Sequence, residues 1–301
     1  MDLVTCVITT HKRKPEIVER ALKSILNQTH TNIEVFVVDD SPSDWEFRND
    51  VRLMVEGYVT QNVTYIPHDK CMGACVARNT ALENAKGEYI GFLDDDDEWK
   101  PEKIKMLLNG FANENIALVY CGRVLYNDTT GETRVHNKEV YTGMVYDELI
   151  LKNFIGSTSY PLLTTSCLKE IGAFDPLMQS AQDYDVWLRL ARKYEVNYVD
   201  EPLIIYHVHD GEQITKNPIK RINGLERICE KNIDYLSKNK YAYWVRINGM
   251  LTHYIDAKMY GKAVKNWFKA TRKCPFKIKE NFNNLYNMLA RTIVNIRDRR
   301  K

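Results

Sequence analysis

Hydrophobic positions in the first third of the chain follow two alternating patterns. Short continuous runs of apolar and β-branched residues predict strands that are buried on both faces of a parallel sheet, at residues 3–9, 33–38, 63–66 and 88–93. Between these runs, apolar residues recur at the spacing of one helix face, at residues 15–26, 45–56 and 73–85. The βαβαβαβ order predicts an α/β fold with a Rossmann-like, mostly parallel sheet flanked by helices.

The spacing becomes less regular after residue 100. Beyond Lys216 the apolar residues follow helical spacing. This change predicts two parts, a domain over residues 1–215 and a helical extension over residues 216–301. Within the domain, strands are predicted at 116–126, 135–141 and 203–208, helices at 145–152 and 183–194, and a loop leading into a strand at 153–165.

Charge divides the chain at the same place. Residues 216–301 contain 21 Lys and Arg but 6 Asp and Glu, a net charge of +15. Subtracting these from the whole-chain totals of 42 and 40 leaves 21 and 34 for residues 1–215, a net charge of −13. The small overall charge of +2 therefore conceals two regions, and we expect them to have different tasks.

Cysteine usage and the lengths of the apolar runs indicate where the protein works. The seven cysteines are scattered without a C-x-x-C pair, which argues against a disulfide framework or a zinc site. The N-terminus lacks the basic-then-apolar order of a signal peptide, and no apolar run is long enough to span a bilayer. We expect a cytoplasmic protein that is soluble or peripheral on the inner face of the cell membrane.

Four consecutive carboxylates, Asp94 to Asp97, follow the predicted strand at 88–93. Adjacent carboxylates at a strand end repel one another unless a countercharge is present. Mg²⁺ and Mn²⁺ prefer carboxylate oxygens and commonly bridge them to phosphates. Since parallel sheets bind ligands at the carboxyl ends of their strands, the pattern predicts a metal and diphosphate site. The alternative is a solvated acidic turn before a helix that Pro101 begins.

Seven blocks of the sequence together resemble family 2 glycosyltransferases with the GT-A fold. Their order and spacing match, and the resemblance covers roughly residues 3 to 212, leaving the extension outside it. The blocks lie at residues 4–13, 37–41, 73–79, 87–97, 172–175, 182–190 and 206–209.

The resemblance implies a site for a nucleotide sugar. Thr9, His11 and Asp40 would hold a uridine or thymidine base, with Asp40 accepting the ring imide proton. His11 stands where the family usually has Tyr. Arg78 would lie near the nucleotide diphosphate, although an Arg on a helix could equally pair with Glu83 or Glu88 on the surface.

The same resemblance assigns roles to the carboxylate cluster. Asp96 would bind Mn²⁺ or Mg²⁺ most directly. Asp94 or Asp95 would reach the ribose, or the metal through water. His209 would join the metal or the departing diphosphate. Asp97 is expected to be a charge at the N-terminus of a helix.

The resemblance places the catalytic base at Asp183, within a block that usually reads Glu-Asp. Gln182 replaces that Glu here. Asp185 competes for the role, but residues two apart on a helix point to nearly opposite sides, and Arg189 is a partner for Asp185 four residues on. We therefore expect Asp183 to take the proton from the acceptor hydroxyl.

The implied function is that of an inverting, metal-dependent glycosyltransferase of the bacterial surface-polysaccharide type. It would move a hexosyl or N-acetylhexosaminyl group from a UDP-sugar, or from a dTDP-sugar, to a hydroxyl of a glycan or lipid-linked saccharide. The alternative is a non-catalytic protein of the same fold that binds a nucleotide sugar or serves as a scaffold. A nucleotidyltransferase is a third interpretation. The first strand is not followed by a Gly-rich phosphate loop and a Lys, which argues against it.

The extension over residues 216–301 interleaves aromatic side chains with Lys and Arg. Such a composition suits an interfacial helix on an anionic membrane surface. The alternative is a helical bundle that packs its aromatics inward and exposes its charges, with a surface that would permit a homodimer. Nucleic acid is not expected as a partner, because nothing besides the positive charge supports it.

Overall fold

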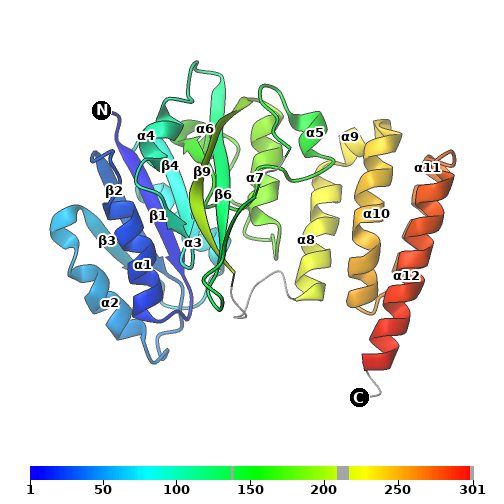
Figure 1. The fold of residues 1–301 in the computed structure, drawn as a ribbon, viewed down its shortest axis with the longest axis horizontal. Helices are drawn as coiled ribbons and strands as arrows, with labels where there is room; N and C mark the ends of the chain where they lie inside the picture. The colour runs from blue at the N-terminus through cyan, green and yellow to red at the C-terminus, as the bar shows by residue number, and fades with distance from the viewer. Residues whose placement is uncertain (137–138, 209–216, 299–301) are drawn as a thin grey trace. The chain divides into compact units, whose positions relative to one another are not determined.

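A computed structural model describes residues 1–136, 139–208 and 217–298 (Figure 1). The chain divides into two compact units. The N-terminal unit comprises Met1–Pro176 and Asp183–Asp210, and the C-terminal unit comprises Leu177–Gln182 and Gly211–Lys301. The C-terminal unit therefore includes a short segment, Leu177–Gln182, from outside the predicted extension.

One sheet forms the centre of the N-terminal unit (Figure 1). Its strands are β1 (Val4–Thr10), β2 (Ile33–Asp39), β3 (Val63–Pro67), β4 (Tyr89–Asp94), β5 (Glu98–Trp99), β6 (Ile116–Asn127), β7 (Thr133–His136), β8 (Leu162–Thr164) and β9 (Glu195–Val208). Their order is β3-β2-β1-β4-β8-β6-β9-β5, with β7 paired to β6. The four predicted strands β1 to β4 pair in parallel, as expected. β8 is antiparallel to β4 and β6, whereas β6 and β9 are parallel.

Helices of the N-terminal unit pack apolar stripes against this sheet. The first helix begins at Pro15, where the missing N–H of proline leaves no helical hydrogen bond unmade. Its residues Val18, Leu22 and Ile25 are fully buried in the core. The helices are α1 (Pro15–Leu26), α2 (Arg48–Glu56), α3 (Ala74–Asn84), α4 (Lys103–Leu108), α5 (Tyr146–Leu149), α6 (Thr165–Glu170) and α7 (Gln182–Ala191), with the 3-10 turn η1 (Val59–Gln61).

Several predicted elements differ from the observed ones. α2 begins at Arg48 instead of residue 45, and α5 is a single turn. The strand predicted at 203–208 is the end of the much longer β9, which pairs along β6 with register shifts around Gly122. Pairing with the long strand β6 stabilises the polar part of β9 as a strand. The local sequence pattern alone does not predict this extension. The strand predicted at 135–141 overlaps β7 only at residues 135–136; residues 137–138 lie outside the described residues, and residues 139–141 are not strand.

Lys103 is a charged residue within the core of the N-terminal unit. It is completely buried, and its Nζ lies 3.8 Å from the centroid of the Trp99 ring. Among the described residues its Nζ finds no hydrogen-bond partner. Burial lowers the pKa of Lys103 to about 8, because removal from water disfavours the charged form.

Replacing Lys103 with Met should therefore change how stability depends on pH. Between pH 8 and the ordinary pKa of 10.5 the folded protein binds fewer protons than the unfolded chain, so the wild type gains stability as pH rises. This gain amounts to about 3 kcal/mol in all. In denaturant unfolding, Lys103→Met should have a higher free energy of unfolding than the wild type. The difference should be largest below pH 8 and should narrow towards pH 10. If the free energies of unfolding of the two proteins change with pH in parallel, Lys103 does not have the lowered pKa.

The C-terminal unit is a bundle of helices. Its helices are α8 (Pro218–Lys231), α9 (Ile233–Lys238), α10 (Lys240–Asp256), α11 (Tyr260–Lys273) and α12 (Ile278–Asp298). The core forms around α10, with Trp244, Leu251 and Tyr254 buried. Nε1 of Trp244 donates a hydrogen bond of 2.8 Å to Oδ1 of Asn281, which ties α10 to α12.

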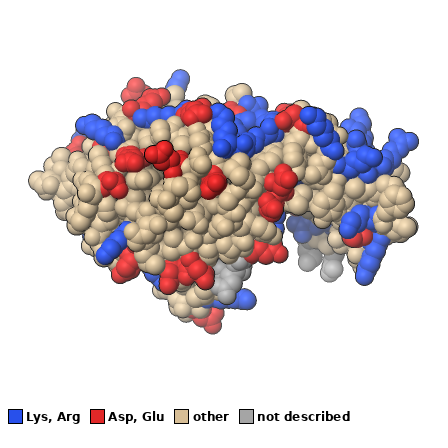
Figure 2. Space-filling model, turned by 90° about the horizontal axis from the view of Figure 1, so that it is seen from above, with Lys and Arg blue, Asp and Glu red and all other residues tan. Residues whose placement is uncertain are grey.

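The aromatic side chains of this bundle fall into two groups. Some pack inward, as the bundle interpretation expects, whereas Phe276 is 95 % exposed and Phe282 and Tyr286 are also exposed. Lys and Arg side chains gather over α11 and α12 (Figure 2). Within the described ranges, no helix combines the length and apolar character required to cross a bilayer.

Candidate active site

The parallel register of three strands brings the predicted site residues to one edge of the sheet. β1 lies between β2 and β4, so that Thr10 pairs with Asp39 and Thr9 pairs with Asp94. Asp40 follows Asp39 directly, and His11 follows β1. The predicted residues Thr9, His11, Asp40 and Asp94 therefore come from neighbouring strand ends, as expected for a ligand site of an α/β sheet.

Asp40 is a buried carboxylate surrounded by hydrogen-bond donors. Its Oδ1 accepts from Nδ1 of His68 and from the backbone N–H of Met72, both at 2.7 Å. Its Oδ2 accepts from the backbone N–H of Gly73 at 2.8 Å and from the thiol of Cys71 at 3.4 Å. Burial would raise the pKa of Asp40, but these hydrogen bonds, that from His68 first, outweigh it and hold the pKa below its usual range. Asp40 is thus an ionised acceptor.

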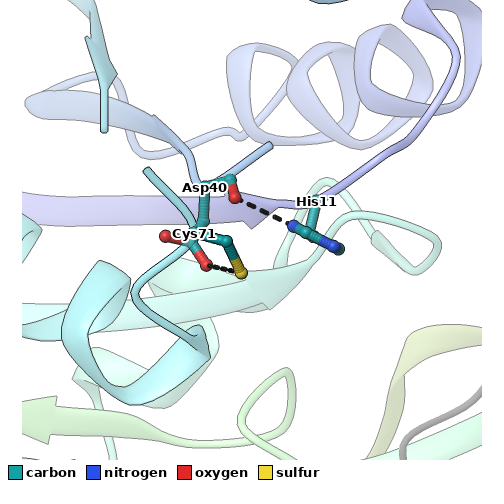
Figure 3. A group of neighbouring side chains, drawn as sticks. All are labelled: His11, Asp40 and Cys71. Carbon is teal, nitrogen blue, oxygen red and sulfur yellow. Dashed lines mark hydrogen bonds between the residues drawn. The ribbon is translucent and has the colours of Figure 1, made fainter. Parts of the chain in front are cut away.

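His11, Asp40 and Cys71 each offer one metal-ligating atom, and these atoms lie within 4.8 Å of one another (Figure 3). Nδ1 of His11 lies 2.9 Å from the carbonyl oxygen of Asp40. A cation here would have to displace hydrogen-bond donors that already occupy both carboxylate oxygens. Burial, with the neighbouring Asp40 carboxylate, raises the pKa of the Cys71 thiol, which weakens it as a ligand. The arrangement favours binding of a hydrogen-bond donor over binding of a cation. Such a donor would replace the thiol of Cys71, whose hydrogen bond to Asp40 is the longest at 3.4 Å.

Asp94 and Asp96 are the accessible members of the carboxylate cluster. Oδ1 of Asp94 accepts from Nη2 of Arg78 at 3.1 Å and from Oγ1 of Thr158 at 2.9 Å. Oδ2 of Asp96 accepts from Nη2 of Arg13 at 2.6 Å. Their side chains are 30 % and 22 % exposed. Because both present carboxylate oxygens at one strand end, they fit the donor set that a hard divalent cation requires. His209, the other predicted ligand, lies outside the described residues.

Asp95 and Asp97 are buried and point elsewhere. Asp95 accepts from Oγ1 of Thr10 at 2.8 Å and Nε of Arg13 at 3.0 Å, and burial raises its pKa to about 6. Asp97 accepts from Oγ of Ser159 at 2.7 Å. The expectation that Asp97 is an N-terminal helix charge is wrong, because β5 follows it and its side chain is buried. Burial and the charges of Asp94 and Asp96 raise the pKa of Asp97 well above its usual range.

Arg78 lies on α3, which begins after Gly73. Gly73 has a φ of +93°, a conformation that suits glycine, and this turn aims its N–H at Asp40. Arg78 is buried, and its guanidinium lies 5.4 Å from the centroid of the Phe174 ring. Arg78 pairs with Asp94 within the site, at 3.1 Å.

Asp183 and Asp185 occupy different environments in the first turn of α7. Oδ1 of Asp183 accepts the backbone N–H of Tyr184 at 2.7 Å. Burial raises the pKa of Asp183 to about 6, while the nearby charge of Arg78 lowers it and that of Asp94 raises it. Asp185 is buried, and its Oδ2 accepts from Nε and Nη2 of Arg189 at 2.9 and 2.8 Å. Asp185 therefore pairs with Arg189, and Asp183 is the carboxylate near the cluster.

Three residues near the site were not predicted. Arg13 holds Asp95 and Asp96, and it lies in the first block of the resemblance. His68 follows β3 at the edge where the other strand ends meet, and that placement was its available signal. His207 is buried between Oδ1 of Asp128 at 2.5 Å and Oε1 of Glu98 at 2.8 Å, partners distant in the sequence that no local pattern indicates.

Comparison with known proteins identifies the family. The family model described as Glycosyl transferase family 2 matches residues 5–172, more than half of the chain. The chain belongs to glycosyl transferase family 2.

Two relatives are similar to this chain along most of their length. The chain is 31 % identical over 255 residues to WcaA of Escherichia coli K12, named as a glycosyl transferase of colanic acid biosynthesis, covering 80 % of this chain and 85 % of WcaA. It is 28 % identical over 263 residues to WfaP of Escherichia coli, named UDP-Glc:alpha-D-GlcNAc-diphosphoundecaprenol beta-1,3-glucosyltransferase, covering 84 % of this chain and 96 % of WfaP. The protein is a glycosyltransferase.

Solved structures confirm the GT-A fold of this family 2 enzyme. TarS 1–349 of S. aureus, in complex with UDP-GlcNAc, superposes with a TM-score of 0.68 at 15 % identity, covering 97 % of this chain and 89 % of that structure. The mannosyltransferase PcManGT of Pyrobaculum calidifontis, in complex with GDP-Man and Mn²⁺, gives a TM-score of 0.62 at 18 % identity, covering 96 % and 84 %. At these identities the similarity shows the fold alone.

The two aspartates of α7 should differ in their effect on stability. Asp185→Ala leaves Arg189 without its carboxylate, and breaking a buried pair should lower the free energy of unfolding by about 3 kcal/mol. Asp183→Asn should leave stability unchanged or raise it at pH 7, because ionisation of a carboxyl whose folded pKa lies above 3.8 costs free energy in the folded state. Denaturant unfolding of both variants measures the contrast. Equal losses would contradict the structural role of Asp185.

Proposed function

We propose that this glycosyltransferase transfers a sugar from a UDP-sugar, with a dTDP-sugar as the second candidate donor, to a hydroxyl of a lipid-linked saccharide or glycan in surface polysaccharide biosynthesis. The observation that carries the proposal is that neighbouring strand ends bring Asp40, a hydrogen-bond acceptor, to the same edge of the sheet as the accessible Asp94 and Asp96. The name of WfaP states a UDP-glucose donor and a lipid diphosphate acceptor, and that of WcaA a role in colanic acid synthesis. Both support this substrate class.

Asp40 selects the nucleotide in this proposal. The ring imide N–H of uracil or thymine would donate to Oδ2 of Asp40, where the Cys71 thiol is the longest contact at 3.4 Å. Cytosine offers no such proton. Thr9 and His11, next to Asp40 at the end of β1, would line the base.

Asp96 would hold the divalent cation, and Asp94 would contact the ribose or the hydrated metal. When bound, Mn²⁺ or Mg²⁺ would neutralise charge on the leaving diphosphate. Arg78 holds Asp94 through an ion pair of 3.1 Å and adds a positive charge beside the same strand end. Arg13 restricts Asp96 in the same way, so both carboxylates are oriented before the donor arrives.

Asp183 would act as the general base. With a pKa of about 6 it is mainly ionised at pH 7 yet more basic than an ordinary carboxylate. It would take the proton of the acceptor hydroxyl while that oxygen bonds to the anomeric carbon and the bond to the diphosphate breaks. Attack from the face opposite the diphosphate inverts the configuration, giving a β-linkage from an α-linked donor.

Calorimetry with UDP, dTDP, GDP and CDP, each with and without Mn²⁺, tests the donor site. We expect binding of UDP or dTDP that strengthens with Mn²⁺, and a loss of about tenfold or more in Asp96→Ala from the missing metal contact. Asp50→Ala, an exposed carboxylate on α2, is the matched control and should bind like the wild type. Asp40→Ala should weaken binding with or without Mn²⁺.

Transfer of glucose from UDP-glucose to a short-chain α-D-GlcNAc-diphosphate lipid then tests the reaction. Binding of UDP without any transfer in a screen of UDP-sugars would favour the non-catalytic nucleotide-sugar-binding alternative. Absence of binding for all four nucleotides in both conditions would exclude the proposed donor site.

We further propose that the C-terminal unit binds an anionic lipid surface through α12. Five large apolar side chains of α12 are 57–71 % exposed, and their spacing of four, four, three and four residues places them on one helix face. Residues 260–298 contain nine Lys and Arg but two Asp and Glu, which complements anionic lipid. We call these five residues the α12 face: Ile278, Phe282, Tyr286, Leu289 and Ile293.

Sedimentation with vesicles tests the α12 face. The full chain should bind vesicles of phosphatidylcholine and phosphatidylglycerol, bind pure phosphatidylcholine less, and lose binding in high salt. The triple variant Phe282→Ser, Tyr286→Ser, Leu289→Ser should reduce partitioning about tenfold or more because apolar burial is lost. Leu53→Ser with Val59→Ser, exposed apolar positions of the N-terminal unit, is the control.

Two outcomes would overturn the lipid proposal. Equal vesicle binding by the triple variant and the wild type would show that the α12 face is not the contact. A dimer that light scattering detects in the wild type and not in the triple variant, without vesicle binding, would identify the face as an interface between two copies.

A further inference from the structure

The segment that leads into Asp183 belongs to the C-terminal unit. Leu177–Gln182 forms one compact unit with α8 and the helices after it, and the chain passes to the N-terminal unit at Asp183. Asp183 is the first residue after this segment and lies in the first turn of α7. Leu177–Gln182 is therefore joined covalently to the start of the helix that carries Asp183.

Gly224 of α8 lies directly against the backbone of Ser180. A Cβ placed on Gly224 would lie 2.9 Å from the carbonyl carbon of Ser180 and 2.6 Å from its Oγ, and closer still to its carbonyl oxygen. Carbon atoms do not approach a backbone this closely, so one of the two segments would have to move. Only glycine fits at position 224 with the segment in this place.

Polar contacts with Arg221 and Asn223, which precede Gly224 in α8, hold the same segment. Nδ2 of Asn223 donates to Oε1 of Gln179 at 3.0 Å, and Oγ of Ser180 donates to the carbonyl oxygen of Arg221 at 3.4 Å. Ser180 is buried. α8 itself has a defined start, because the side chain of Asn217 accepts from the backbone N–H groups of Ile219 and Lys220.

The turn between Ser180 and Asp183 adopts a conformation that needs outside support. Ala181 has a φ of +54°, in the left-handed region that non-glycine residues seldom occupy. Nε2 of Gln182 donates to the carbonyl oxygen of Met178 at 3.1 Å, closing the turn. Such a strained residue persists when its surroundings hold it in place, and here the contacts of α8 with Gln179 and Ser180 provide that hold.

We propose that α8 positions the general base: Gly224 and Asn223 fix residues 179–180 and thereby set the direction in which Asp183 leaves the turn. Both act through the segment and neither touches substrate. The inference rests on the proposed function for the role of Asp183, whereas the contacts themselves lie within the C-terminal unit. It gives the C-terminal unit a part in the chemical step, separate from any binding to lipid.

Gly224→Ala in the full-length protein tests this positioning. Displacement of the base by a fraction of an ångström to one ångström should lower kcat about tenfold to a hundredfold, with UDP-glucose and the short-chain GlcNAc-diphosphate lipid as substrates and no vesicles present. The Kd for UDP with Mn²⁺ should stay within about twofold, because Asp40 and Asp96 lie on other elements. The acid limb of the kcat–pH profile should shift, since the environment of Asp183 changes.

Two further variants make the result interpretable. Gly249→Ala, in the interior of α10 with open space around its Cα, is the matched control and should keep the wild-type kcat. Asn223→Ala removes the exposed hydrogen bond to Gln179 without a clash, so it should fold normally and show a smaller loss of kcat with the same shift of the acid limb.

Hydrogen exchange separates a failure of this inference from a failure of the proposed function. Faster exchange across residues 177–187 in Gly224→Ala, and not in Gly249→Ala, is expected even if the substrates assigned to the enzyme are wrong. Unchanged exchange and an unchanged kcat would overturn the positioning role. Parallel losses of kcat and UDP affinity would also overturn it, because they would indicate a general loss of folding.

Discussion

Repulsion among the four adjacent carboxylates at the end of β4 is the constraint on which the rest of the site depends. The structure separates them into two accessible and two buried groups. Arg13 holds Asp95 and Asp96 together, while Arg78 holds Asp94. Asp97 accepts from Ser159, and burial first, then the charges of Asp94 and Asp96, raise its pKa. Two fixed guanidinium groups therefore offset part of the negative charge that is concentrated at this strand end.

The partners of these carboxylates explain why the sheet order matters. Arg13 follows β1, the strand next to β4, and Arg78 comes from α3, which precedes β4 in the chain. The same order brings Asp40 beside His68, at the ends of β2 and β3. The site is thus assembled from strand ends by parallel register, so that a slip of one residue in β1 would separate Thr9 from Asp94.

Sequence pattern predicted the elements whose burial is continuous and failed where a distant partner decides the structure. β1, β2 and β4 are buried almost throughout, β3 at the sheet edge is only partly buried, and all four were predicted within one or two residues. Asp97 was expected to be a charge at the N-terminus of a helix, but β5 follows it and pairs with β9, and the helix α4 begins only at Lys103. His207 and its two carboxylates lie 79 and 109 residues apart in the chain, and no local signal predicts such a contact.

The division between the units shows a further limit of composition as a guide. The charge balance changes near residue 216, yet Leu177–Gln182 folds with the helices that follow this point. A break in composition marks where the charge balance changes, whereas membership of a unit depends on packing, such as that of Gly224 against Ser180. Because the basic helices and the segment before Asp183 share one unit, lipid binding and placement of the base would use the same scaffold.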